Sequence, residues 1–460
     1  MELENLLEAV AFEGIVPGSY SGEHASLMPF LEDTRSGEEP EIKSLVHHDL
    51  DGQEHEVRGS EPVKYRSSYS RARGSFSLSM PKTAMERHKP ADVLALEEFL
   101  RKAYKAPQLV VTKVESVPIT RKDVRRVFFA LRNQLYQVWA FKADPATTAR
   151  ELTASTIAWN HGIPTGKPLG FNLARHARSY PYDTALLGGI LEHAGDSYDS
   201  LLDNLSYAPG LMFGTAHSVA HMLAQFHVNL TEAREEFSSY GVVLQRASPR
   251  REIEKRMLPV LGIDSSNQNA EQFIRACENL YDRQRGDLVV SHGDIHTGNI
   301  VTLMSIDAVR HQPKTSLHKF GIIDFESISL DYPQGDLADF WLHHQRKALE
   351  VFPDYNYSFE KFSESYFQKL GQLARNHDVV STSFYRASHA PIQKALWNVY
   401  ELFDPTRTQK DEIMKKAQFH YRALCETMGD LQEHGLSRDR RDVLQALHSL
   451  LKKTHYKRIL

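Results

Sequence analysis

Ser291-His-Gly-Asp-Ile-His-Thr-Gly-Asn299 and Phe320-Gly-Ile-Ile-Asp-Phe-Glu326 are the two most informative segments of the sequence. The first has the form His-x-Asp-x-x-x-x-Asn, in which a carboxylate and an amide side chain lie five positions apart. The second is an apolar strand that ends in two carboxylates at alternate positions, Asp324 and Glu326. Together they offer a carboxylate that can orient a hydroxyl group and several of the hard oxygen ligands that Mg²⁺ prefers.

The spacing of the first segment is that of the catalytic loop of protein-kinase-like enzymes, which contains an Asp base and an Asn metal ligand. Phosphoryl transfer needs a group that orients the acceptor hydroxyl and a few oxygen ligands for the metal. Asp294, Asn299 and Asp324 would supply both. The two segments therefore predict phosphoryl transfer as the chemistry of this chain.

The overall composition is that of an ordinary globular protein. The 460 residues are enough for two or three domains, and 41% of them are apolar and 25% charged. The net charge of −4 gives no global attraction to nucleic acid or to an anionic membrane. The N-terminus has no signal-peptide pattern, and no run of about 18 apolar residues occurs. We therefore expect a cytoplasmic protein that binds neither nucleic acid nor membrane.

The cysteines and histidines indicate neither a disulfide framework nor a zinc site. Cys277 and Cys425 lie in apolar helical patterns, which predicts two buried free thiols. The 23 histidines are scattered, and none of them forms a cluster with zinc-ligand spacing. His217 and His221 are four residues apart on a predicted helix, but no third ligand is evident, so we expect them at a helix surface or core edge.

Residues 1–105 match no pattern that we can name, and we expect an N-terminal extension or cap of unknown role. Met1–Gly14 has the spacing of a short amphipathic helix. Val63–Met80 alternates in part, as an exposed hairpin or a loosely ordered segment would. A further helix is predicted from Ala91 to Tyr104.

Residues 106–193 are predicted to form a small first lobe. Runs of β-branched and aromatic residues predict five strands, with one helix after the third. The strands are expected at Leu109–Val117, Val124–Leu131, Leu135–Ala143, Thr165–Phe171 and Thr184–Glu192, and the helix at Thr147–Asn160. Three strands, one helix and two strands are the order of the N-terminal lobe of a kinase.

Residues 194–460 are predicted to form a second, mainly helical lobe that contains both informative segments. Apolar residues recur there at helical spacing. The helices are expected at Ala216–Val228, Asn269–Arg285, Gly335–Glu350, Ser358–Asn376, Pro391–Phe403, Thr408–Glu433 and Arg438–Lys453. Trp341, Trp397 and Tyr400 lie in these helices and are expected in the core, with the alternative that one or two line an acceptor pocket.

The placement of one lysine indicates how the first lobe would bind nucleotide. Lys142 lies near the end of the third strand, from which a lysine can reach the α- and β-phosphates. Glu151, on the following helix, is the best partner to orient it. The strand that ends at Glu192 and His193 resembles a hinge, whose backbone N–H and C=O groups would bind an adenine edge.

In four elements the sequence resembles the aminoglycoside phosphotransferase and choline kinase superfamily, which has the protein-kinase-like fold. They are Leu223-Ala-Gln-Phe-His227, the His292–Asn299 loop, Ile322-Ile-Asp-Phe-Glu326 and Gly335-Asp-Leu-Ala-Asp-Phe-Trp341. The 25 residues from Asn299 to Asp324 (324 − 299) leave room for a hairpin. The resemblance runs from about Gln108 to Trp341 and more loosely through the C-terminal helices. It implies an α+β protein with a bilobal fold, a small antiparallel-sheet N-lobe and a mainly helical C-lobe.

Carried over residue by residue, the resemblance implies roles for the catalytic loop and its neighbours. Asp294 would be the catalytic base, or the carboxylate that orients the acceptor. Asn299 and Asp324 would bind Mg²⁺, and Glu326 would lie near the metal or the acceptor. His292 would brace the loop by hydrogen bonding, as would Asp336 at the start of its helix.

The first lobe departs from the pattern of the superfamily in two places. The loop Pro118-Ile-Thr-Arg-Lys-Asp123, between the first two strands, contains no glycine, which makes a close approach of its backbone to phosphate harder. The separation of Lys142 from Glu151 is also short for the superfamily. Neither departure removes the predicted base or the metal ligands.

The predicted function is an ATP- and Mg²⁺-dependent phosphotransferase that acts on a hydroxyl group of a small polar molecule. A sugar, an amino-sugar, an aminoglycoside or an amino-alcohol would each fit. Carboxylates and aromatics on the acceptor side would suit a polar or cationic molecule. They are Asp331, Asp336, Asp339 and Glu350, with Trp341 or Trp397. Oligomeric state is left open.

Two other functions remain open at this point. One is a pseudokinase that binds nucleotide without catalysis and serves as a scaffold through residues 1–105; the glycine-free loop favours it. The other is a kinase whose macromolecular substrate docks on residues 1–105. The three residues Asp294, Asn299 and Asp324 argue against the scaffold, because a site without catalysis does not require them.

Overall fold

The computed structural model describes most of the chain from residue 91 onward. The described residues are 45–48, 54–57, 91–116, 123–131, 134–142, 145–166, 168–170, 188–192, 196–205, 209–240, 242–284, 287–302, 320–374, 390–403 and 410–459. Strands β1 (Leu45–His48) and β2 (Glu54–Val57) pair antiparallel. The predicted helix at Met1–Gly14 and the predicted hairpin at Val63–Met80 lie outside the described residues.

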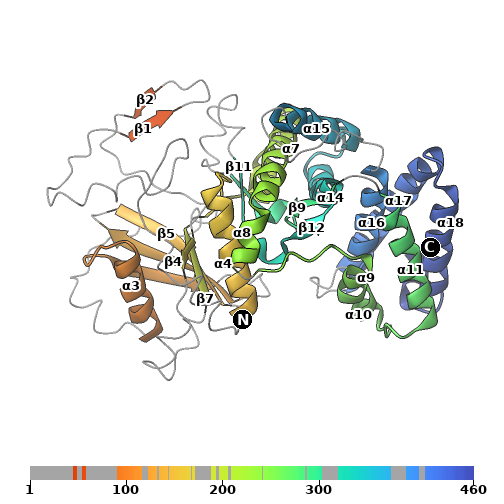
Figure 1. Cartoon of the computed structure of the whole chain (residues 1–460), viewed down its shortest axis with the longest axis horizontal. Coiled ribbons are helices and arrows are strands. Elements are labelled where there is room, and N and C mark those ends of the chain that lie inside the picture. Colours follow the sequence, from red (N-terminus) through yellow and green to blue (C-terminus); the bar gives the residue numbers. More distant parts are fainter. Residues whose placement is uncertain are drawn as a thin grey trace. The chain divides into compact units, whose positions relative to one another are not determined.

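The chain divides into two compact units that interleave along the sequence. Unit 1 comprises Met1–Ser218, Ala233–Val243 and Gly298–Glu326, and unit 2 comprises Val219–Glu232, Leu244–Thr297 and Ser327–Leu460. Figure 1 shows the elements of both. The domain boundaries expected at residues 105 and 193 stay predictions.

Unit 1 is built on a five-stranded sheet in which all neighbouring strands run antiparallel, in the order β3-β4-β5-β7-β6. The strands are β3 (Val110–Ser116), β4 (Asp123–Leu131), β5 (Gln134–Lys142), β6 (Pro168–Gly170) and β7 (Gly188–Glu192). All five strands predicted from the sequence are present; β6 begins after the expected residue 165, and residues 184–187 of the predicted fifth strand lie outside the described residues.

Helix α3 (Ala91–Ala103) packs on this sheet. Its apolar side chains join those of β3, β4 and β5 in one core. Glu97 of α3 is 1% exposed, and its Oε2 accepts a hydrogen bond of 2.6 Å from the backbone N–H of Val111. Arg101 pairs with the other oxygen of Glu97 at 2.7 Å. Helix α3, which belongs to the end of the expected N-terminal extension, is thus bound to the sheet by a hydrogen bond as well as by apolar packing.

A smaller sheet of unit 1 joins distant parts of the sequence. It has the order β11-β10-β8, from β11 (Phe320–Ile322), β10 (Ile300–Thr302) and β8 (Asp196–Ser197). Helix α6 (Tyr198–Asn204) follows β8 and begins with an N-cap at Ser197, whose hydroxyl accepts from the N–H of Ser200. In this sheet, Ile300 of β10 is paired directly with Ile322 of β11.

Unit 2 consists of helices around a two-stranded sheet of β9 (Val289–Ser291) and β12 (Ser329–Asp331), which pair antiparallel. Its longer helices are α11 (Gln268–Asp282), α14 (Pro333–Val351), α15 (Phe359–Ala374), α16 (Ala390–Glu401), α17 (Lys410–Glu433) and α18 (Ser437–Leu451). The helix predicted at Ala216–Val228 is also present, as the longer α7 (Pro209–Glu232). The α+β class is therefore confirmed, and the bilobal arrangement stays a prediction.

Apart from short 3-10 turns, three helical segments of the described residues have no counterpart in the sequence prediction: α6, α8 (Arg234–Ser239) and a composite segment of residues 249–261. The composite segment consists of α9 (Pro249–Glu252), a π-helical turn η3 (Ile253–Met257) and α10 (Leu258–Leu261). Pro259 lies just after the π turn and cannot donate a backbone hydrogen bond, which is incompatible with a regular helix interior.

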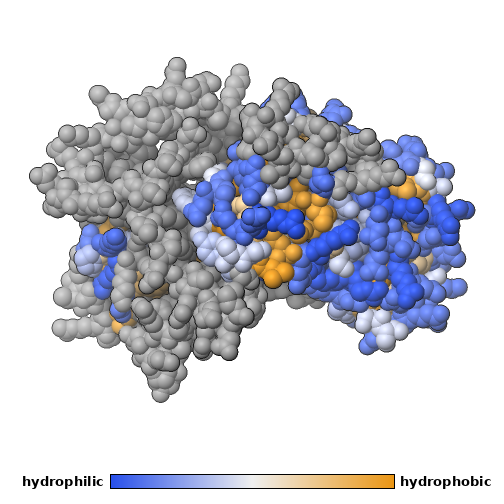
Figure 2. All heavy atoms as spheres, in the orientation of Figure 1, coloured by the Kyte–Doolittle hydropathy of each residue, from blue (hydrophilic) through white to orange (hydrophobic). Residues whose placement is uncertain are grey.

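The outer helices of unit 2 are amphipathic. The buried side of α18 carries Val443, Leu447, Leu450 and Leu451, and α11 contributes apolar residues such as Phe273 to the core. Figure 2 shows a mainly hydrophilic surface over this part of the chain. Among the described helices, none is both long enough and apolar enough to span a membrane.

The two cysteines differ in their surroundings. Cys277 is buried on α11, as expected, and burial raises the pKa of its thiol. Cys425 on α17 is exposed, so the prediction of a second buried thiol was wrong. The apolar pattern around Cys425 is real, but its position faces away from the residues of α17 that are buried, such as Leu424 and Met428.

Asp331 at the end of β12 is buried and joins three elements. Its Oδ1 accepts hydrogen bonds from the hydroxyl of Tyr281 at 2.7 Å, the N–H of Tyr332 at 2.7 Å and Nε2 of Gln393 at 3.3 Å. Burial is the largest influence on this carboxyl and raises its pKa to about 7, although the hydrogen bonds act in the opposite direction.

We predict that Asp331 makes unit 2 less stable as the pH rises. The folded pKa lies above the value of an unfolded Asp, so the stabilisation by the neutral carboxyl is complete below about pH 4 and is lost towards pH 7. Asp331→Asn, which stays neutral, should remove a pH-dependent loss on the order of 2–4 kcal/mol. Urea unfolding of both proteins from pH 4.5 to 8 measures it. If the free energy of unfolding depends on pH in the same way in both proteins, Asp331 does not titrate in this range.

Candidate active site

The loop that follows β9 in unit 2 has one position that only glycine can occupy. Gly293 has a φ of +77°, in the left-handed region that favours glycine. A Cβ atom added there would lie 2.5 Å from the backbone oxygen of Ser327, closer than real Cβ atoms approach. The glycine of the His-Gly-Asp sequence therefore lets the loop pass directly against residue 327.

Asp336 holds the same loop from the side of α14. Its carboxylate accepts hydrogen bonds from Oγ of Ser291 (2.8 Å) and from the N–H groups of His292 (2.8 Å) and Gly293 (3.0 Å). Helix α14 begins at Pro333, two residues before the predicted start, so Asp336 lies in the first turn. Its side chain bonds to the loop and does not cap its own helix.

A histidine on α7 completes the environment of Asp336. His227 Nε2 lies 2.9 Å from Oδ2 of Asp336, and its Nδ1 lies 2.7 Å from the hydroxyl of Tyr366. His227 and Asp336 are both 0% exposed. Burial alone would raise the pKa of Asp336, but the hydrogen bond and charge of His227 and the N–H of Gly293 outweigh it, and the pKa lies below its ordinary value.

Asp294, the predicted base, keeps 30% of its side chain exposed. Its Oδ1 accepts a hydrogen bond of 3.2 Å from Nη2 of Arg256. Burial would raise the pKa of Asp294, but Arg256, His296 and His292 outweigh it, and the pKa lies below its ordinary value. The carboxylate is thus both reachable and ionised at neutral pH.

Asn299 and Asp324, the predicted metal ligands, come together in unit 1 at the end of the β10–β11 pair. Ile300 is paired with Ile322 in this hairpin, and the N–H of Ile323 donates to the carbonyl oxygen of Asn299 at 3.0 Å. Asp324 has a φ of +68°, a conformation that Asp and Asn tolerate better than other residues with a side chain.

Three carboxylates of unit 1 converge next to this hairpin. Glu151 of helix α4 (Pro145–Asn160), Asp324 and Glu326 each offer a carboxylate oxygen, and these oxygens lie within 4.8 Å of one another. Like charges this close repel, and a cation among them removes the repulsion. With the amide of Asn299, the set consists of the hard oxygen donors that Mg²⁺ prefers, so the residues fit this ion.

The other nucleotide-binding predictions fall on residues described in part. Lys142 is the last residue of β5 and is paired in register with Asp123 of β4 and Gly188 of β7. Glu192 is the last residue of β7. The side chains of Lys142 and Glu192, His193, and the glycine-free loop before Asp123 lie outside what the structure describes.

Most of the residues expected on the acceptor side have another function in the fold. Asp331 and Asp336 are buried and hydrogen-bonded within unit 2. Trp341 is 1% exposed and packs against Phe362 with ring centroids 5.5 Å apart, so it belongs to the core. Glu350 lies exposed near the end of α14. Asp339 and Trp397 lie on the side of Asp294: the charge of Asp294 acts on Asp339, and Trp397 contacts Arg256, which donates to Asp294.

Three residues around Asp294 were not predicted from the sequence. Arg256 lies in η3, Glu401 at the end of α16 and Lys416 on α17. The one local signal was Pro259 close after a helical Arg/Glu pattern, which indicates an irregular helix but not where its side chains point. Their approach depends on contacts across 38 and 145 residues of sequence.

Comparison with known proteins gave matches among solved structures alone. No protein-family model matches the sequence, and no curated protein matches it. The structure is similar to a choline kinase from Cryptosporidium parvum, with 12% identity, 75% of this chain and 97% of that chain covered, and a TM-score of 0.48.

Two further solved structures are of the same kind. An amicoumacin kinase has 14% identity, 76% and 97% coverage and a TM-score of 0.46. A glucosamine kinase has 15% identity, 77% and 87% coverage and a TM-score of 0.40. The structures found are small-molecule kinases, which is the kind of protein that the sequence motifs resemble.

We predict that Gly293→Ala lowers the free energy of unfolding by roughly 2–4 kcal/mol, because it adds a clash with Ser327 to the left-handed strain. Gly435→Ala is the matched control. Gly435 has the same φ of +77° but nothing within 4 Å of an added Cβ atom, so its substitution should cost only about 1–2 kcal/mol. Equal losses in chemical unfolding of the two variants would contradict the close packing at Gly293.

Proposed function

We propose that the chain is an ATP- and Mg²⁺-dependent phosphotransferase that phosphorylates a hydroxyl group of a small polar molecule. The observation that carries the proposal is Asp294. This carboxylate is partly exposed and ionised, and it lies on a loop whose backbone is held by Asp336. An ionised, reachable carboxylate on a rigid loop is what a hydroxyl acceptor needs as its base.

In the proposed reaction, Asp294 accepts a hydrogen bond from the acceptor hydroxyl and takes up its proton as the oxygen attacks the γ-phosphorus. The bond from the γ-phosphorus to the bridging oxygen of ADP breaks, and ADP leaves. The low pKa of Asp294 makes it a weak base, so its main effect is to orient the hydroxyl and to take the proton late.

Mg²⁺ would be held by Asn299 and Asp324, with Glu326 beside them. When bound, the metal would neutralise negative charge on the phosphates. The cluster of Glu151, Asp324 and Glu326 supports this assignment, because three close carboxylates favour a cation between them. Asp324 has an unusual backbone conformation, φ +68°, and strained conformations of this kind cluster at ligand sites.

For the nucleotide, we assign Lys142 to the phosphates and the backbone at Glu192 and His193 to the adenine edge. The two residues lie on neighbouring antiparallel strands: Lys142, at the end of β5, is opposite Gly188 of β7, and Glu192, at the end of β7, is opposite Val138 of β5. Glu151 would orient Lys142, and its nearness to Asp324 gives it a second possible role beside the metal.

The proposed acceptor is a class of small polar molecules, and no single compound is assigned. The choline, amicoumacin and glucosamine kinases found by structure comparison act, by their names, on small polar molecules. With Asp331, Asp336 and Trp341 used inside the fold, the carboxylate-rich surface that would favour a cationic acceptor is smaller than the sequence indicates. Neutral sugars are therefore as suitable as amino-sugars or amino-alcohols.

We predict that Asp294→Asn lowers kcat by on the order of 10³ and leaves nucleotide affinity nearly unchanged, because the carboxylate acts on the transition state and not on ATP binding. The assay measures ATP consumption against a panel of sugars, amino-sugars, aminoglycosides and amino-alcohols, and calorimetry measures ATP binding. Asp264→Asn, at an exposed Asp of the same unit, is the control. Nucleotide binding without turnover of any acceptor by the unmodified protein would favour the scaffold function.

For the metal, we predict that Asp324→Ala weakens Mg²⁺-dependent nucleotide binding by roughly tenfold or more, since it removes a ligand. Asp324→Asn separates this loss from backbone strain, because Asn tolerates the left-handed conformation and keeps one oxygen. Titration of ATP with and without Mg²⁺ should rank the affinities as unmodified protein, Asn variant, Ala variant. The same Mg²⁺ dependence in all three would refute the metal assignment.

A further inference from the structure

We infer that Arg256 is the positioning residue of Asp294, which it holds through a direct ion pair, and that Glu401 and Lys416 hold Arg256 in turn. The inference rests on the proposed function, since it gives Arg256 a role through the proposed base. All four side chains belong to unit 2. They come from the loop after β9, from η3, from α16 and from α17.

The guanidinium of Arg256 bonds to three carboxylates at once. Nη2 lies 3.2 Å from Oδ1 of Asp294, Nη1 lies 2.6 Å from Oε1 of Glu401, and Nε lies 3.2 Å from Oε2 of Glu252. Its side chain is 15% exposed. Because three carboxylates bind it from different sides, the planar guanidinium group is held in one orientation. The carboxylate of Asp294 therefore meets a donor in a fixed position.

The ion pairs continue on the far side of Glu401. Nζ of Lys416 lies 2.6 Å from Oε2 of Glu401, whose side chain is 2% exposed. The result is an alternating series of Lys416, Glu401, Arg256 and Asp294. The guanidinium carbon of Arg256 also lies 5.5 Å from the ring centroid of Trp397, which fixes the plane of the guanidinium. Only the last carboxylate of the series reaches solvent to an appreciable extent.

Stability alone does not account for this arrangement. Buried ion pairs are costly to desolvate, and apolar residues of similar size are often as stable or more stable. Here a series of buried charges ends at the one carboxylate that is proposed to do chemistry. Arg256 also lies in the π turn, where the N–H of Leu258 bonds to the oxygen of Ile253, five residues earlier. Such turns redirect side chains and are frequent at functional sites.

Two neighbours on α14, His343 and Asp339, have pKa values shifted by their burial. Burial lowers the pKa of His343 to about 4, so it is neutral at pH 7, although its Nε2 lies 3.6 Å from Glu401. Burial, together with Asp294 and Glu401, raises the pKa of Asp339 well above its ordinary value. Within the described part of the chain, neither carboxylate oxygen of Asp339 has a hydrogen-bond partner.

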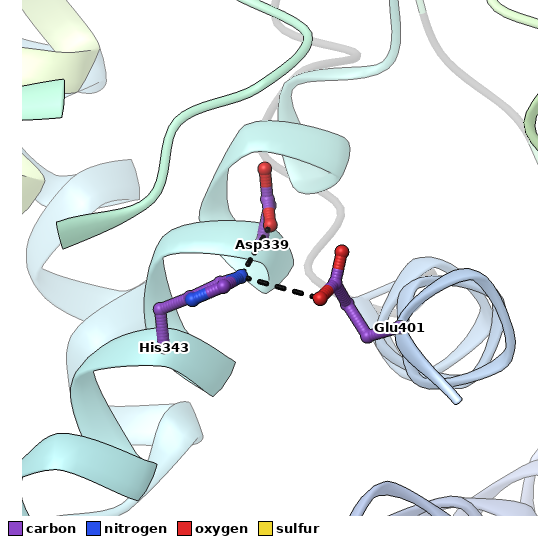
Figure 3. A group of neighbouring side chains, drawn as sticks. All are labelled: Asp339, His343 and Glu401. Atoms are coloured by element: carbon purple, nitrogen blue, oxygen red, sulfur yellow. Dashed lines mark ion pairs between the residues drawn. The ribbon is translucent and has the colours of Figure 1, made fainter. Parts of the chain in front are cut away.

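Asp339, His343 and Glu401 have ligand atoms close enough to hold a metal ion, as Figure 3 shows. The cations already present argue against that function. Both oxygens of Glu401 are bonded, one to Arg256 and one to Lys416. A divalent ion would have to displace an ammonium or a guanidinium group, so we assign the charge of Glu401 to Arg256.

The charges around Asp294 give opposite signs for two substitutions. Positive charge from Arg256, His296 and His292 lowers the pKa of Asp294, and negative charge from Glu401 raises it. Glu252 adds negative charge near Arg256, and Lys416 adds positive charge near Glu401. Loss of Arg256 should therefore raise the pKa of Asp294, and loss of the charge of Glu401 should lower it.

The test uses Mg²⁺-dependent ATP hydrolysis, with water as the acceptor, from about pH 2.5 to 8, because the pKa of Asp294 lies below its ordinary value. Activity is lost as the pH falls through the pKa of Asp294. Arg256→Gln should lower kcat by roughly tenfold or more and move this acid limb up by about one pH unit or more. Glu401→Gln should also lower kcat but move the limb down. Arg256→Lys keeps the positive charge. Its kcat should be lower, but its activity should fall at the same acid pH as that of the unmodified protein.

Arg250→Gln is the matched control, because Arg250 lies on α9 and pairs with Glu271 at 2.8 Å and Glu278 at 3.2 Å, away from Asp294. It should change stability but not the acid limb. A purely structural role for Arg256 predicts less folded protein with an unmoved limb in every variant, and that result overturns the inference. Movement of the limb in the same direction by Arg256→Gln and Glu401→Gln overturns it as well.

A double-mutant cycle separates this inference from the proposed function. In an Asp294→Asn background, Arg256→Gln should change hydrolysis by less than about twofold, because its effect passes through the missing carboxylate. If Asp294→Asn hydrolyses ATP normally, the proposed base is wrong. If Asp294→Asn is inactive and Arg256→Gln matches the unmodified protein, only the positioning role is wrong. In chemical unfolding, coupling between the two positions of at least about fivefold in the folding equilibrium constant is expected, whether or not an acceptor is known.

Discussion

The buried carboxylate of Asp336 is the interaction on which the geometry of the candidate site depends. It is 0% exposed and has no Arg or Lys partner among the contacts described. A buried carboxylate is tolerated only when donors surround it. The loop at residues 291–293 supplies three of these donors, two of them backbone N–H groups, and His227 supplies the fourth contact. The loop therefore cannot move without leaving a buried charge unsatisfied.

Unit 2 deals with its buried acids in three different ways, and each has a different consequence. Asp336 stays ionised through hydrogen bonds and holds backbone. Asp331 has a raised pKa because burial outweighs its hydrogen bonds, and Asp339 has one because burial and the charges of Asp294 and Glu401 outweigh the charge of Arg256. Glu401 stays ionised between Arg256 and Lys416, and Arg256 in turn forms an ion pair with Asp294. Asp336 makes the loop rigid, whereas Glu401 and its cationic partners set the electrostatic surroundings of the proposed base, Asp294.

Sequence patterns predicted much of the fold because helices and strands depend on local periodicity. The strands of the sheet of unit 1 and the long helices of unit 2 lie close to their expected ranges. The misses are short or irregular: α6 and α8 are too short for periodicity, and Pro259 interrupts the pattern of residues 249–261. Cys425 shows that an apolar stretch does not tell which side of a helix is buried.

The sequence by itself determined the chemistry that the chain can offer: a His-x-Asp-x-x-x-x-Asn loop, a strand ending in Asp324 and Glu326, and their order along the chain. Spacing within a loop or strand sets which groups are presented together, and no distant contact is needed to read it. Only the tertiary structure decided which distant charges meet them. Arg256 is 38 residues from Asp294 and 145 from Glu401, and burial and close packing, which no local pattern encodes, bring the three together.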